Sequence, residues 1–314
     1  MLLKPLKSLY YKFRYDLPLW IDSKCSKPYI RLLSHKYFAN SEEGRKQAIL
    51  RDYEIFFGKT FDFENPQTLC QKLQWLKFYY SNPLMTQCAD KYAVRQYVEK
   101  TIGKEYLNEL IGAYDSVSEI DFDSLPNQFV LKVNWGSGQN LICSDKGSIN
   151  VREYKKQLRS WLMPLSNHYY FSLESSYKDI PPKITCEKYL GSDINDYKIM
   201  CFNGEPRFLW VDVGRFTDHK RCVYDLNWNV MDVSINYPKY DCSVERPGLL
   251  EKSLELAALL SKPFPFVRVD FYICENKLVF GELTFFPEAG LMNITPSDWD
   301  KKWGDLLVLP KVVP

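Results

Sequence analysis

Two acidic residues near the C-terminal end of the chain, Asp270 and Glu282, are the clearest candidates for chemistry. The segment 265–286 reads PFVRVDFYICENKLVFGELTFF, and its apolar and polar residues alternate with the two-residue period of strands on either side of a polar turn. A three-residue loop over 275–277 predicts that Asp270 lies opposite Glu282 and Arg268 opposite Thr284. In this register Leu278, Phe280, Glu282 and Thr284 share one face of the return strand.

Facing carboxylates repel each other, and their repulsion is costly beside a buried apolar face. A divalent cation would relieve it, and hard cations such as Mg²⁺ prefer carboxylate oxygens. A solvated hairpin face with ordinary surface charges would give the same local pattern. The hairpin alone leaves both interpretations open.

Lys132 lies inside the apolar run FVLKV (129–133), where a lysine is costly to bury unless its ammonium meets an anion. Gly136, Ser137 and Gly138 follow as a short flexible loop whose backbone N–H groups could approach phosphates. The segment lacks the spacing of a P-loop, and a GSG tripeptide more often only reverses the chain. A phosphate-facing lysine and loop are therefore a hypothesis.

Two further segments are ambiguous by themselves. A strand-like run is followed by Glu187, Lys188, Tyr189 and Leu190. The end of such a strand could offer backbone groups to the edge of a base. A plain strand exit with a surface acid is the simpler interpretation. Lys198 shares a predicted strand face with apolar residues, where a lysine can extend to solvent.

The elements that must position these residues are helices and strands in mixed order. Helical periodicity predicts helices over 67–80, 90–102, 151–165 and 248–260. Strands are predicted over 129–133 and repeatedly from 184 onward, with an Asn203-Gly204 hairpin turn. This interleaving favours an α+β fold over a single parallel sheet.

Composition excludes several classes of protein. The 314 residues carry a net charge of +2, which gives no argument for a nucleic-acid partner. Nine scattered cysteines without a CxxC pair argue against a disulfide framework and a structural zinc site, and favour reduced thiols. With three histidines, a histidine-rich metal centre is not expected.

The first forty residues are strongly basic and interleaved with apolar residues. They could form an amphipathic helix on an anionic membrane surface. A solvated helical arm packed on the body is the favoured interpretation, because Pro18 and Pro28 interrupt the pattern.

The order of these features along the chain resembles the ATP-grasp superfamily, and more closely its branch related to the teichuronopeptide biosynthesis protein TupA, found among bacterial surface-polysaccharide genes. The resemblance covers about two thirds of the chain. It is carried by DKYAVR (90–95), LPNQFVLKVNWGSG (125–138), EKYL (187–190), DYKIMCFNGEP (196–206), RVDFY (268–272) and FGELTFFPEAG (280–290).

The resemblance implies a nucleotide site between two α+β subdomains, preceded by a helical N-terminal region. By position, nucleotide contacts are implied for Lys91, Lys132, Gly136, Ser137, Gly138, Glu187, Lys188, Tyr189, Leu190 and Lys198. Within this set, Gly136 to Gly138 would form a mobile lid over the phosphates and Glu187 to Leu190 a hinge that reads adenine. Arg268 would contact the transferred phosphate, with Lys198 as a further catalytic lysine, and Asp270 and Glu282 would hold Mg²⁺.

One position departs from the family pattern. Many ATP-grasp enzymes place an asparagine two residues after the glutamate as a further magnesium ligand, whereas this chain has Thr284. Thr284 is therefore a weaker candidate metal ligand.

The implied activity is that of an ATP- and Mg²⁺-dependent carboxylate–amine ligase with an acyl-phosphate intermediate, joining an amine or amino acid to a uronic acid or similar carboxylate of a surface glycan. A glycosyltransferase that uses a nucleotide sugar, or an ATP-dependent kinase, is the alternative.

The predicted domains are a basic helical region over 1–88, a lid subdomain over 89–189 and a large subdomain over 190–314. A cytoplasmic protein is expected. Whether the basic N-terminus contacts the inner face of the membrane, and which oligomeric state the protein adopts, are left open.

Overall fold

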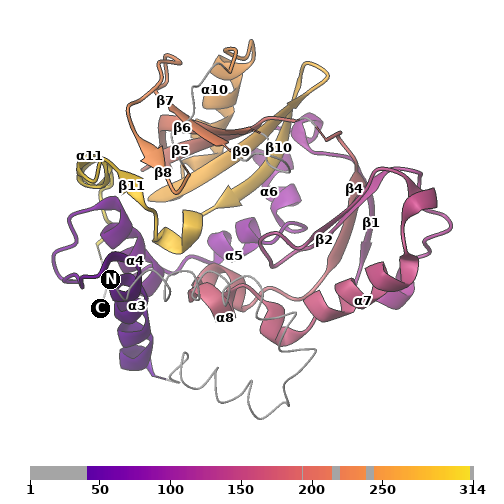
Figure 1. The fold of residues 1–314 in the computed structure, drawn as a ribbon, viewed down its shortest axis with the longest axis horizontal. Coiled ribbons are helices and arrows are strands. Elements are labelled where there is room, and N and C mark those ends of the chain that lie inside the picture. Colours follow the sequence, from indigo (N-terminus) through magenta and orange to yellow (C-terminus); the bar gives the residue numbers. More distant parts are fainter. Residues whose placement is uncertain (1–40, 193, 214–219, 238–243, 312–314) are drawn as a thin grey trace.

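Two antiparallel sheets form the body of the molecule (Figure 1). The computed structural model describes residues 41–192, 194–213, 220–237 and 244–311. The predicted basic arm lies outside these residues. The smaller sheet has the order β1-β4-β2-β3. Its strands are β1 (Leu110–Tyr114), β2 (Phe129–Val133), β3 (Asn140–Cys143) and β4 (Ile184–Lys188).

The larger sheet has the order β10-β9-β5-β6-β7, also with antiparallel neighbours. A short two-stranded pair, β8 with β11, lies beside it. The strands are β5 (Asp196–Phe202), β6 (Glu205–Val213), β7 (Lys220–Tyr224), β8 (Ser234–Ile235), β9 (Phe266–Cys274), β10 (Lys277–Thr284) and β11 (Ile294–Thr295).

Helices surround and connect the sheets (Figure 1). Helix α10 packs against β5, β6 and β9, and α5 and α6 lie between the two sheets. The helices are α3 (Glu42–Phe57), α4 (Leu69–Tyr79), α5 (Pro83–Ala89), α6 (Val94–Thr101), α7 (Val151–Trp161), α8 (Tyr169–Ser172), α9 (Ser175–Lys178), α10 (Leu250–Ser261) and α11 (Asp298–Leu306). The predicted α+β class is thereby confirmed.

Strand β2 shows how the sequence positions the site. Phe129, Leu131 and Val133 are fully buried in the core, whereas Val130 and Lys132 alternate with them on the other face. The apolar residues thus fix the register of the strand and direct Lys132 away from the core.

Helix α4 binds the C-terminal part of the chain. Thr68 caps it in a capping box with Gln71. Lys72 Nζ donates to the carbonyl oxygens of Gly304 and Leu307, both at 2.8 Å. The predicted helix over 67–80 thus packs mainly against α11 near the C-terminal end of the chain.

The predicted domain limits stay a prediction, although the boundary after residue 189 lies between β4 and β5. No helix in the described part of the chain is long and apolar enough to cross a bilayer.

Cys222 is disulfide-bonded, so the expectation of reduced thiols is wrong at this residue, whereas six other described cysteines are free.

Candidate nucleotide site

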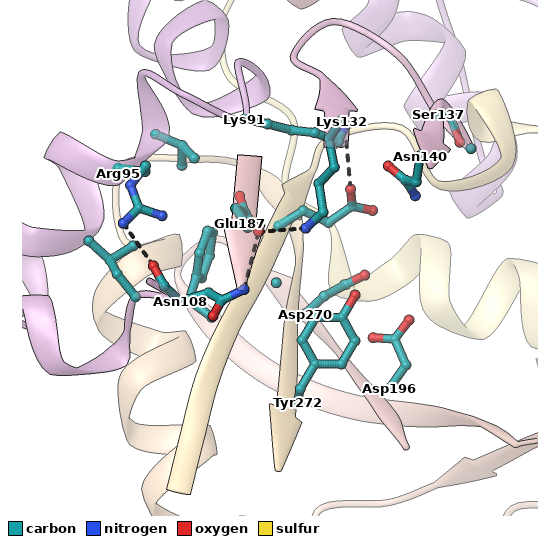
Figure 2. Close-up of a pocket in the computed structure, with 16 residues that line it drawn as sticks. Lys91, Arg95, Asn108, Lys132, Ser137, Asn140, Glu187, Asp196, Asp270 and Tyr272 are labelled. Atoms are coloured by element: carbon teal, nitrogen blue, oxygen red, sulfur yellow. Dashed lines mark hydrogen bonds and ion pairs between the residues drawn. The ribbon is translucent and has the colours of Figure 1, made fainter. Parts of the chain in front are cut away.

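A cleft of about 770 Å³, its open mouth included, lies between the two sheets. Its lining has the cations, together with Glu187, on the side of α6 and the small sheet, and further carboxylates on the side of the large sheet (Figure 2). Lys91 comes from the turn before α6, Arg95 from α6 and Lys132 from β2, while Asp270 and Glu282 come from β9 and β10. This polarity suits a polyphosphate bound together with a cation.

The hairpin of β9 and β10 pairs the two carboxylates as predicted, but its turn is shorter than predicted and β10 contains a bulge. Asp270 pairs with Glu282 and Arg268 with Thr284, as predicted. The loop, however, has two residues, Glu275 and Asn276, both with positive φ as a tight hairpin turn requires.

A bulge at Gly281 restores the pairing that the shorter loop would have displaced. Phe280 pairs with Phe271 before the bulge and Glu282 with Asp270 after it. The prediction that Leu278, Phe280, Glu282 and Thr284 share one face is therefore wrong, because neighbouring residues of β9 point to opposite faces. A Cβ on Gly281 would lie 3.1 Å from the Asp270 carbonyl oxygen, which favours glycine at the bulge.

Arg268 links the candidate metal ligands. Its Nε and Nη2 donate to the two oxygens of Asp270 at 2.7 and 2.6 Å. The same Nη2 donates to Glu282 Oε1 at 2.8 Å and to Thr284 Oγ1 at 3.0 Å. Burial raises the pKa of Asp270, and the charges of Arg268 and Lys198 oppose that shift.

Lys198 lies beneath the cleft within a network of buried ion pairs. Its ammonium contacts Asp196, lies 3.2 Å from Asp270 Oδ2 and 3.7 Å from Asp212 Oδ2. Arg221 donates to both oxygens of Asp212. The side chain of Lys198 is 5% exposed, so carboxylates separate its ammonium from the cleft.

Lys132 forms an ion pair with Glu187 at 2.7 Å (Figure 2). Burial by itself would raise the pKa of Glu187, but the charge and hydrogen bond of Lys132, with help from Arg95, lower it. Lys132, predicted to contact phosphates, and Glu187, which the family resemblance places in the hinge, are thus direct partners.

Replacing Lys132 with Met is expected to lower the free energy of unfolding by about 1–3 kcal/mol at neutral pH, because Glu187 loses its cation. The folded-state pKa of Glu187 is lowered, so the pair stabilises above the unfolded pKa, and this contribution is lost as the pH falls through the lowered folded pKa. Urea unfolding at about pH 7 and about pH 3, which bracket the ordinary glutamate pKa, measures the change. The exposed Lys188→Met is the control, and an equal loss at both pH values would contradict the assignment.

Lys91 connects the hairpin to the Gly-rich loop. Its Nζ donates to the carbonyl oxygen of Gly136 at 2.7 Å and lies 3.9 Å from Glu282 Oε2. Burial lowers the pKa of Lys91, and Glu282 opposes that effect. In the loop itself Gly138 has a φ of 71°, a conformation that favours glycine.

The cleft brings together half of the residues predicted for the site. Those that line it are Lys91, Lys132, Ser137, Gly138, Glu187, Asp270 and Glu282. The others lie next to it or below it without lining it: Gly136, Lys188, Tyr189, Leu190, Lys198, Arg268 and Thr284.

Several lining residues were not predicted as site residues from the sequence. Asp196 and Tyr272 could have been found, because each lies two residues from a candidate on the same strand face. Arg95 and Asn108 gave no such signal, since their place depends on tertiary packing. The remaining lining residues are Val94, Leu107, Asn140, Phe280 and Gly281.

The residues present fit a magnesium ion held mainly by its substrate. In the described ranges no group of three or more His, Cys, Asp or Glu side chains could hold a metal. Mg²⁺ commonly uses one or two protein carboxylates together with phosphates and water, which Asp270 and Glu282 can satisfy. The hydroxyl of Thr284 already donates to Glu282 Oε1 and accepts from Arg268, so it is the weakest of the predicted ligands.

Two antiparallel sheets around a lysine-lined cleft define an ATP-grasp fold. The chain belongs to the TupA-like ATP-grasp family, whose model matches residues 71–308. The predicted family and fold are thereby confirmed. No curated protein matches the chain.

Solved structures are similar at low identity. D-alanine–D-alanine ligase from Bacillus anthracis is 18% identical, with a TM-score of 0.39, 71% of this chain covered and 66% of the ligase. N5-carboxyaminoimidazole synthetase from Staphylococcus aureus, complexed with ADP, is 15% identical, with a TM-score of 0.40, 78% of this chain covered and 56% of the synthetase. The chain thus spans less than two thirds of either protein.

Proposed function

We propose that this protein is an ATP- and Mg²⁺-dependent carboxylate–amine ligase, which joins an amine or amino acid to a uronic acid or similar carboxylate during assembly of a bacterial surface polysaccharide. Membership of the TupA-like ATP-grasp family supports the reaction class. The observation that carries the proposal is the division of charge in the cleft, with Lys91, Arg95 and Lys132 facing Asp270 and Glu282.

The cations on the lid side would bind and orient the triphosphate. Lys132 is held by Glu187 and Lys91 by Gly136, so both ammonium groups are positioned before a nucleotide arrives. Ser137 and Gly138 would cover the phosphates. Asp270 and Glu282 would hold Mg²⁺, which when bound neutralises charge on the phosphates.

The proposed reaction has two displacements. An oxygen of the substrate carboxylate attacks the γ-phosphorus of ATP and ADP leaves, giving an acyl phosphate. The amine nitrogen then attacks the acyl carbon; inorganic phosphate leaves, and the nitrogen loses a proton to form the amide. Arg268 would stabilise the charge on the transferred phosphoryl group, and no covalent enzyme nucleophile is required.

Release of inorganic phosphate from ATP is expected only when a carboxylate and an amine are both present. A panel of UDP-uronic acids combined with free amino acids, assayed for phosphate and ADP, tests this prediction. ADP formed without free phosphate would indicate a kinase. If only UDP- or GDP-sugars, and not ATP with Mg²⁺, raised the melting temperature, a glycosyltransferase would replace the ligase.

A further inference from the structure

The turn that follows β10, Pro287–Gly290, has a strained backbone. Glu288, Ala289 and Gly290 have φ angles of 53°, 56° and 70°, all in the left-handed region. Glycine adopts this region freely, whereas a residue with a Cβ is disfavoured there. Such strain persists where the surrounding structure enforces it, and it is found most often at functional sites. A use for the side chain of Glu288 is therefore to be sought.

Helix α4 enforces the conformation of this turn. Gln74 Nε2 donates to the carbonyl oxygens of Ala289 and Gly290 at 3.0 and 2.9 Å. Lys77 Nζ donates to the carbonyl oxygen of Ala289 at 2.6 Å. Gln74 and Lys77 are 1% and 3% exposed. Two buried polar side chains thus fix the backbone from which Glu288 extends.

The ion pair of Glu288 does not account for its strained position. Its Oε1 lies 3.7 Å from Arg221 Nη1, which is longer than a hydrogen bond. Arg221 already donates to both oxygens of Asp212, at 2.7 and 3.2 Å. The side chain of Glu288 is 22% exposed, so its carboxylate can be reached from solvent.

Glu288 lies near the arginine that is proposed to contact the transferred phosphate. The strained turn begins three residues after Thr284, the last residue of β10. The guanidinium groups of Arg221 and Arg268 both contact the ring of Trp210, with Cζ 4.5 and 5.8 Å from its centroid. The cation paired with Glu288 is thus a close neighbour of Arg268.

The carboxylates that line the cleft are bound more tightly than Glu288. Each accepts a hydrogen bond from a lysine or an arginine at 2.8 Å or less: Glu187, Asp196, Asp270 and Glu282. Glu288 is therefore the acid at this end of the site that is best able to accept a new cationic partner.

We propose that the carboxylate of Glu288 binds the ammonium group of the amine substrate. This inference rests on the proposed ligase activity. Primary amines are largely protonated at neutral pH, and a carboxylate binds an ammonium through charge-assisted hydrogen bonds. The enforced turn would hold the carboxylate in place before the amine arrives.

Replacement by glycine separates a binding role from a structural one. Glu288→Gly should raise the midpoint of urea unfolding of the full chain, because glycine relieves the strain. Ala289→Gly, the matched control in the same backbone conformation, should raise it as well. A lower midpoint for Glu288→Gly alone would show that the ion pair with Arg221 accounts for the residue, and would overturn the inference.

Amine binding is tested with the common L-amino acids, ethanolamine and putrescine as probes, in the presence of ATP and Mg²⁺. One of these amines is expected to raise the melting temperature of the wild type, whereas its N-acetyl form, which carries no ammonium at that nitrogen, should not. In titration calorimetry, Glu288→Gln should raise the Kd of that amine about tenfold and leave the Kd of ATP unchanged.

Glu275→Gln, in the turn between β9 and β10, is the control for the loss of charge and should leave both Kd values unchanged. An equal amine Kd in the wild type and Glu288→Gln would overturn the inference, as would an equal effect of the N-acetyl form. No effect of any probe on a wild type that ATP and Mg²⁺ stabilise would also overturn it, with the proposed use of ATP still standing. A wild type that ATP and Mg²⁺ do not stabilise would overturn the proposed function as well.

Discussion

Glu282→Gln is expected to reduce ATP-dependent turnover on the order of 10²–10³-fold while leaving the ligand-free protein as stable as the wild type. The side chain of Glu282 is 40% exposed, and exposed substitutions usually change stability little. Removing its charge weakens the binding of Mg²⁺ at the hairpin. Besides turnover, the increase in melting temperature caused by ATP with Mg²⁺, compared with ATP and a chelator, should shrink in the variant.

Asp270→Asn is expected to lower stability as well as turnover, unlike Glu282→Gln. Asp270 is 2% exposed and accepts two hydrogen bonds from Arg268, with Lys198 3.2 Å away. Its neutralisation leaves two buried cations without their shared anion, so a loss of about 3 kcal/mol in unfolding free energy should accompany the loss of turnover. Glu275→Gln, in the exposed turn of the same hairpin, is the control. Full metal-dependent activity in both site variants would show that the carboxylates do not bind the metal.

The hairpin also shows why the sequence predicted the facing carboxylates but not their surroundings. Alternation along β9 placed Arg268 and Asp270 on one face, and that expectation is confirmed by the register. The two-residue turn and the bulge at Gly281 were missed, because each shifts the register by one residue and the two shifts cancel at Glu282. A glycine inside a strand pattern was the available signal.

Other parts of the site depend on contacts that no local pattern contains. Asn108 and Lys188 are 80 residues apart in the sequence, and they meet because β4 pairs with β1. Lys198 was expected beside an apolar face near the nucleotide. Its burial among Asp196, Asp212 and Asp270 arises from three adjacent strands, so only the sheet order reveals it.

Arg268→Met is expected to have the largest effect on stability, about 3–5 kcal/mol, because it leaves Asp270 buried without its main partner. Turnover should fall on the order of 10³-fold, as expected for an arginine that stabilises a transferred phosphoryl group. Arg268→Lys keeps the charge, but an ammonium lacks the fork that binds both oxygens of Asp270. It should recover part of the stability and little of the turnover.

A double-mutant cycle tests whether the stability effect comes from the pair itself. If Arg268 stabilises mainly through Asp270, the variant carrying both Arg268→Met and Asp270→Asn should be more stable than the sum of the single effects predicts, by about 1–3 kcal/mol in urea unfolding. Strictly additive losses would mean that Glu282 and Thr284, which the same guanidinium contacts at 2.8 and 3.0 Å, are its main partners. Asp270 is much more buried than Glu282, so we expect its ion pair with Arg268 to contribute more to the stability of the hairpin. Strictly additive losses of unfolding free energy would contradict this expectation.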